Sequence, residues 1–107
     1  MNVAHYAALF FGGMFLFNAL PHLAAGVMGR PFQSPFATPR GEGLSSSTVN
    51  VLWGFFNLFM AWALLARVGH LDLQDGTRML ATGAGGMLIS LFAARHFGRF
   101  HGGNTPT

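Results

Sequence analysis

Three long stretches without a charged side chain most constrain how this chain can fold. They run from about residue 3 to 27, from 48 to 66 and from 79 to 94, and the charged residues lie between and after them. The third predicted span extends to residue 96. A helix rises about 1.5 Å per residue and a bilayer's hydrocarbon core is about 30 Å thick, so the first two stretches can cross it. Sixteen uncharged residues give the third only about 24 Å. We expect it to cross with Arg78 and Arg95 reaching outward; the alternative is a re-entrant or surface helix.

The composition supports this interpretation. Hydrophobic residues make up 51% of the 107 residues and charged residues only 8%, against about 25% in an ordinary soluble domain. The first stretch is preceded by almost no positive charge, so we expect a retained span and not a signal peptide. The sequence predicts an all-α integral membrane protein, a single transmembrane domain over residues 1–107 with three transmembrane helices.

The connecting segments differ in character. The first loop, residues 28–47, is rich in Pro, Gly and Ser and cannot continue a helix, because each proline lacks a backbone donor. It also holds Phe32 and Phe36, which a featureless linker would lack, so we expect an ordered first loop. A short loop covers residues 67–78 and a polar tail covers residues 97–107.

The charges of these segments predict an orientation. One side of the membrane would hold the N-terminus with Arg67 and Arg78, and the other would hold Arg30, Arg40, Arg95 and Arg99. Positively charged loops favour the cytoplasm, so the four-to-two distribution places the N-terminus outside and the C-terminus in the cytoplasm. We expect a bacterial cytoplasmic (inner) membrane.

A polar cluster interrupts the apolar spans. Asn18 and His22 are four residues apart and share one helix face. Pro21 cannot donate to the Phe17 carbonyl, which therefore needs another partner inside a membrane. Asn50 and Asn57 lie at the same depth on the second span. We expect the polar groups of the first span to face these two amides.

Small residues predict where the helices pack. Gly54 lies on the same stripe as the two amides of the second span, and Thr82, Gly86 and Ser90 recur every four residues on the third. Such stripes let helix backbones approach closely. We interpret them as helix-packing faces.

A second polar group lies where the first loop meets the membrane. Ser45, Ser46 and Ser47 precede the second span, and Arg95 and His96 end the third on the same side. Hydroxyls and unpaired backbone amides at a helix start favour an anion. The group is either an ordinary helix cap or a site for an anion or lipid headgroup.

These residues exclude several functions. The arginines are too sparse for nucleic-acid binding. Cysteine is absent, which excludes disulfides, thiol catalysis and Cys-ligated metals. No set of Ser, His and acid supports hydrolysis, so we expect no enzyme activity. The leading hypothesis is a small interaction protein, an accessory subunit that packs with other membrane subunits or copies of itself in the lipid bilayer. The alternatives are an oligomeric pore or carrier for a small solute or anion, and an electron-transfer protein binding haem or quinone through His22. No cofactor is required by the sequence, and no metal site is predicted beyond His22 as a haem ligand.

Overall fold

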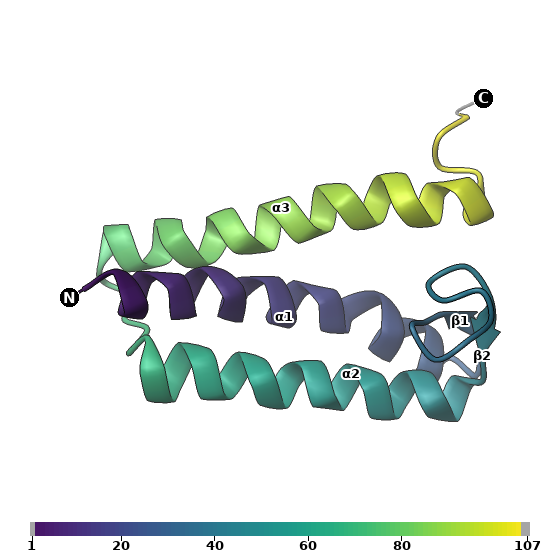
Figure 1. The fold of residues 1–107 in the computed structure, drawn as a ribbon, viewed down its shortest axis with the longest axis horizontal. Coiled ribbons are helices and arrows are strands. Elements are labelled where there is room, and N and C mark those ends of the chain that lie inside the picture. The colour runs from purple at the N-terminus through teal and green to yellow at the C-terminus, as the bar shows by residue number, and fades with distance from the viewer. Residues whose placement is uncertain (1, 106–107) are drawn as a thin grey trace.

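Three helices dominate the computed structural model, which describes residues 2–105 (Figure 1). They are α1 (Val3–Val27), α2 (Ser47–Trp62), which continues into the π-helical segment η1 (Ala63–Val68), and α3 (Gly76–His101). Two-residue strands, β1 (Phe32–Gln33) and β2 (Leu44–Ser45), form an antiparallel ribbon between α1 and α2. The fold is all-helical apart from this ribbon, and all three helices are long and apolar enough to span a membrane.

Helix α1 is the centre of the fold. Both α2 and α3 pack along it, and Figure 1 shows α1 running between them. The same view shows α1 and α3 diverging toward the end where the β-ribbon and the C-terminus lie. The backbones of α1 and α3 are therefore close at one end of the bundle, here named the closed end, and farther apart at the other, here named the open end, where the first loop lies (Figure 1).

The third helix is longer than the third uncharged stretch of the sequence. It includes Gly76–Arg78 before that stretch and continues through the first residues of the expected polar tail to His101. Asp75 caps its start by accepting bonds from the backbone N–H groups of Thr77 and Arg78. These bonds, with one from the Thr77 hydroxyl as the largest cause, lower the pKa of the Asp75 carboxyl. Gly102 ends the helix at a φ of 81°, which glycine adopts readily.

The second helix also extends beyond its predicted end. It begins at Ser47, with Ser46 as the N-cap, and its last turn widens into η1 up to Val68. In this wide turn the Gly69 N–H bonds to the Leu64 carbonyl at 2.8 Å. Leu65 points inward and packs with Leu9 and Ala61 in the small buried core.

Glycines hold the closed end of the bundle together. A Cβ placed on Gly85 would collide with the backbone carbonyl of Phe10, and one on Gly13 would collide with the carbonyl of Thr82. The backbones of α1 and α3 are therefore in direct contact at these two positions. Small residues at an interface permit this approach.

At the other end, loop 28–46 is fastened to α3 by three side chains. The His96 Nε2–H donates to the Gly41 carbonyl at 2.6 Å, and the His101 side chain bonds to Gln33 at 2.8 Å. Arg99 forms an ion pair with Glu42 at 3.0 Å. Within the loop, the Ser34 and Ser45 hydroxyls bond to each other across the ribbon.

Candidate functional site

Asn50 is the most connected buried side chain at the open end. It is 0% exposed. Its Nδ2 lies 3.0–3.2 Å from the backbone carbonyls of Phe32, Ser45 and Ser46, and its Oδ1 lies 2.7 Å from the Nδ1 of His22. One amide thus joins α1, the β-ribbon and the start of α2.

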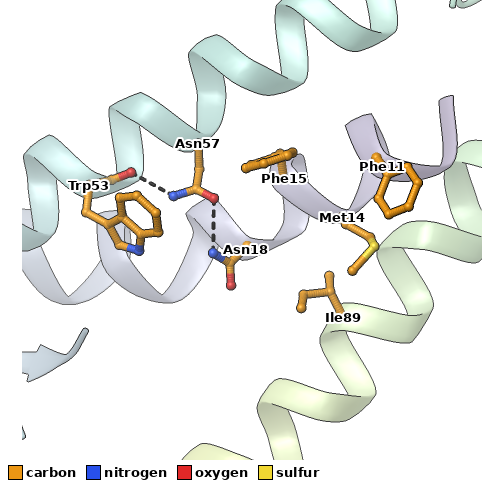
Figure 2. Close-up of a pocket in the computed structure, with 7 residues that line it drawn as sticks. All are labelled: Phe11, Met14, Phe15, Asn18, Trp53, Asn57 and Ile89. Atoms are coloured by element: carbon orange, nitrogen blue, oxygen red, sulfur yellow. Dashed lines mark hydrogen bonds between the residues drawn. The ribbon is translucent and has the colours of Figure 1, made fainter. Parts of the chain in front are cut away.

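Asn57 has a matching arrangement two turns along α2. It is also 0% exposed. Its Nδ2 donates to the Trp53 carbonyl at 2.8 Å, and its Oδ1 accepts from the Nδ2 of Asn18 at 3.0 Å (Figure 2). Each of the two α2 amides therefore accepts a hydrogen bond from one polar residue of α1.

These bonds fix the direction of hydrogen bonding between the helices. Each α2 amide uses its NH₂ group on backbone carbonyls, so only its oxygen faces α1. The α1 partner must then be the donor, and His22 must carry its proton on Nδ1. In the neutral ring, Nε2 is consequently an acceptor. The acceptors His22 Nε2 and Asn18 Oδ1 take part in no hydrogen bond within residues 2–105.

Trp53 adds an unpaired donor to this region. Its indole Nε1 is buried and has no hydrogen-bond partner within the described residues. The ring stacks on Phe56 with centroids 5.5 Å apart and meets the His22 ring edge-on at 6.3 Å. Figure 2 shows the indole nitrogen and the Asn18 oxygen both pointing away from Asn57. A buried N–H without a partner is costly, so it marks a position where a further acceptor would be favoured.

Two cavities adjoin these groups, and Asn18 and Trp53 line both. The first, of about 220 Å³, lies between all three helices. The second, of about 290 Å³, lies under the first loop beside His22. The remaining residues of the first cavity are Phe11, Met14, Phe15, Asn57 and Ile89 (Figure 2). The second is completed by Gln33, Ser34, Pro35, Gly41, Phe92, His96 and Phe97.

No protein-family model matches the chain, and neither the curated proteins nor the solved structures give a significant match. Function is therefore inferred from the chemistry of the site. That chemistry combines the unpaired Trp53 donor with the Asn18 and His22 acceptors beside largely apolar cavities.

The predicted packing residues lie in different surroundings. Gly54 lies against Leu23 of α1, and Gly86 lies against the Phe17 ring. Thr82 is buried and bonds to the Arg78 carbonyl at 2.9 Å. Ser90, by contrast, is exposed and borders a shallow apolar hollow that includes Pro21 and Phe97. Its expected packing role is not seen in this chain, since α1 and α3 diverge toward this end.

The residues predicted to bind an anion are not brought into one site. Ser45 bonds to Ser34, and Ser46 caps α2 by accepting from the Val49 N–H. Ser47 is the first residue of α2. Arg95 and His96 line a separate surface hollow whose other members are Phe92, Arg99 and Asn104.

The described residues offer few groups that could ligate a metal ion or a haem. Residues 2–105 hold no group of three or more His, Asp or Glu side chains that could bind a metal ion. His96, the other histidine beside the second cavity, uses its Nε2 on the Gly41 carbonyl. A haem held by both histidines would require that bond to break.

Sequence reasoning missed several members of the site. Trp53 is three residues from Asn50 and four from Asn57, so the helical spacing that groups the two amides also places Trp53 on their face. Gln33, Ser34 and His101 gave no signal, because they reach the site only through the pairing of the loop with itself and with α3.

Proposed function

We propose that this chain is an integral membrane protein that binds a small molecule with an apolar body and a polar head in the cavities between its helices. The observation that carries the proposal is the buried, unpaired Trp53 indole N–H beside two cavities. A ligand acceptor at this position would remove the cost of the unpaired donor.

Surface chemistry supports the membrane location. The outward side of α2 exposes Leu52, Phe55, Phe59 and Trp62, each more than half exposed, and α3 similarly exposes Leu80, Met87, Leu88, Leu91 and Phe92. Faces of this size and apolarity are not stable in water. In a bilayer they are solvated by acyl chains.

The polar groups support ligand binding over mere helix association. The prediction of partner subunits rests on the polar stripes, because three helices alone can shield few polar groups from lipid. In this structure Asn50 and Asn57 are already paired with His22 and Asn18 inside one chain. The unpaired Trp53 indole N–H is buried within the same chain. Assembly with other subunits or with copies of the chain stays a prediction that this geometry does not require.

The first loop has a role in this proposal. We expect it to be ordered and to cover the second cavity, because Asn50, His96 and His101 each bond to it. Ligand would then enter from the lipid side between the diverging helices.

The ligand-binding proposal is tested by identifying what the full chain carries. The wild type, a cavity-filling variant (Ile89→Phe) and a control (Trp62→Phe) are extracted in polymer-bounded lipid particles and analysed by native mass spectrometry. Trp62 is 52% exposed and lines neither cavity. We expect a small molecule on the wild type and control, and less on Ile89→Phe. Equal content in all three excludes the first cavity as the binding site, and no small molecule on the wild type contradicts the proposal.

Orientation is a separate part of the proposal. We expect the N-terminus outside and the C-terminus in the cytoplasm of a bacterial inner membrane, on the charge distribution given above. Because the chain has no cysteine, single cysteines at Asn2, Leu73 and Asn104 report the topology. The first two should label from outside only and the third from inside only. Labelling of positions 2 and 104 from one side would exclude three spans.

A further inference from the structure

The hydrogen-bonding groups at the two cavities also restrict the chemical class of the ligand. We infer that the ligand is a neutral molecule of one or two aromatic rings that carries both a carbonyl and a hydroxyl oxygen. This inference rests on the proposed function and goes beyond it by specifying charge, shape and polar groups.

The unpaired groups determine which polar atoms the ligand needs. Trp53 offers only a donor, since an indole nitrogen cannot accept. It therefore requires an acceptor such as a carbonyl oxygen. Asn18 and His22 each donate a hydrogen bond to an amide oxygen on α2. The remaining Asn18 Oδ1 and His22 Nε2 atoms are therefore acceptors. They require a donor such as a hydroxyl.

The cavity linings determine the charge. Apart from the two histidines, every described residue lining either cavity is uncharged. Arg99 and Glu42, which lie nearby in the fold, are paired with each other at the surface. Burying an ionised ligand among aromatic and amide groups without a counter-charge is costly, so the ligand is neutral.

Size and wall chemistry determine the shape. A cavity of about 150 Å³ is enough for benzene, so cavities of about 220 and 290 Å³ hold one or two rings. Several walls of the second cavity are flat rings that meet at steep angles. The Trp53 and Phe97 rings are both edge-on to His22. Aromatic rings prefer such edge-to-face and offset contacts.

The two indole groups of the chain provide the test. In a ¹⁵N–¹H spectrum of the full chain in lipid nanodiscs, Trp53 and Trp62 each give one indole signal, assigned with Trp62→Phe. The probe is 4-hydroxyacetophenone, which carries one carbonyl and one hydroxyl on a single ring. We expect its binding to move the Trp53 proton downfield, as a new hydrogen bond does, and to leave Trp62 unmoved.

Three relatives of the probe test each group separately. With 4-methoxyacetophenone the hydroxyl donor is lost, and affinity should fall about five- to tenfold. With 4-ethylphenol the carbonyl is lost, and the downfield shift of Trp53 should disappear. The charged 4-hydroxybenzoate should not bind. Ile89→Phe, which narrows the first cavity, should weaken the response to the main probe while the Trp62 signal keeps its position.

The outcomes separate this inference from the proposed function. Equal affinity for the hydroxy and methoxy probes, tighter binding of the carboxylate, or an unmoved Trp53 signal would overturn the ligand class. If a different molecule still co-purifies with the wild type and is lost in Ile89→Phe, the proposed function survives alone. If the wild type binds no probe and carries no co-purified molecule, both fail.

Discussion

The two ends of the helix bundle are held together in different ways. At the closed end, α1 and α3 touch through backbone at Gly13 and Gly85, and Leu9 and Leu65 fill the core. At the open end, α1 and α2 stay close at Gly26 and Gly54 and are joined by hydrogen bonds to the Asn50 and Asn57 side chains, whereas α3 diverges from α1 (Figure 1). Close packing of α1 on α3 leaves no space for a ligand at the closed end, whereas the divergence of α3 leaves cavities beside the paired α1 and α2 at the open end. The tightly packed contact of α1 with α3 and the candidate site therefore lie at opposite ends of one short bundle.

The largest effect is expected from adding a methyl group at the closed end. Gly85→Ala should cost about 3 kcal/mol or more of unfolding free energy, because its Cβ would collide with the rigid Phe10 backbone. Gly83→Ala is the matched control, since a Cβ there meets nothing within 4 Å. Thermal unfolding in micelles, followed by circular dichroism, measures both. Equal stability of the two variants would show that the closed end is not packed as described.

Removing the central amide of the open end should have the next largest effect. Asn50→Ala leaves the His22 Nδ1–H and the ribbon carbonyl of Phe32 without their partner. We expect a loss of about 2–3 kcal/mol. Asn57→Ala removes fewer bonds and should cost less. The same unfolding measurement ranks the variants, and the reverse order would contradict the connecting role given to Asn50.

Substitutions of His22 sharpen the comparison by separating stability from function. His22→Ala should cost about 1–2 kcal/mol, because the Asn50 oxygen loses its donor. His22→Gln can still donate, so it should recover much of that stability. Yet its amide does not reproduce the aromatic acceptor facing the second cavity, so probe affinity should remain reduced. Full recovery of both properties would make His22 a packing residue only.

The smallest effect is expected at the surface of the open end. Glu42→Gln removes the ion pair with Arg99, whose side chain is 55% exposed, and such pairs contribute at most about 1 kcal/mol. The measurement is the unfolding temperature at low and high salt. We expect the wild type to lose its small advantage as salt rises. A large salt-independent loss would mean that the loop depends on this one contact.

Much of the fold follows from local rules, and much of the site does not. Uncharged length predicts three helices, and four-residue spacing places Asn18 and His22 on one face. The charged residues predict a third helix shorter than α3, because the caps Asp75 and Gly102, and not the charges, set the ends of α3. The wide turn η1 and the contacts of Gln33, Gly41 and His101 depend on tertiary pairing that no local pattern encodes.

The glycine contact between α1 and α3 also has a mechanical consequence. Because Gly85 touches the Phe10 backbone, it can serve as a fulcrum, and the part of α3 beyond it acts as a lever arm. From Gly85 to Phe97 the arm is about 18 Å long. A tilt of about 10° would therefore move Phe97 by about 3 Å. His96, Arg99 and His101 all lie on this arm, so the loop would travel with it. Small rotations of α3 at the closed end would therefore set the distance between α1 and α3 at the open end.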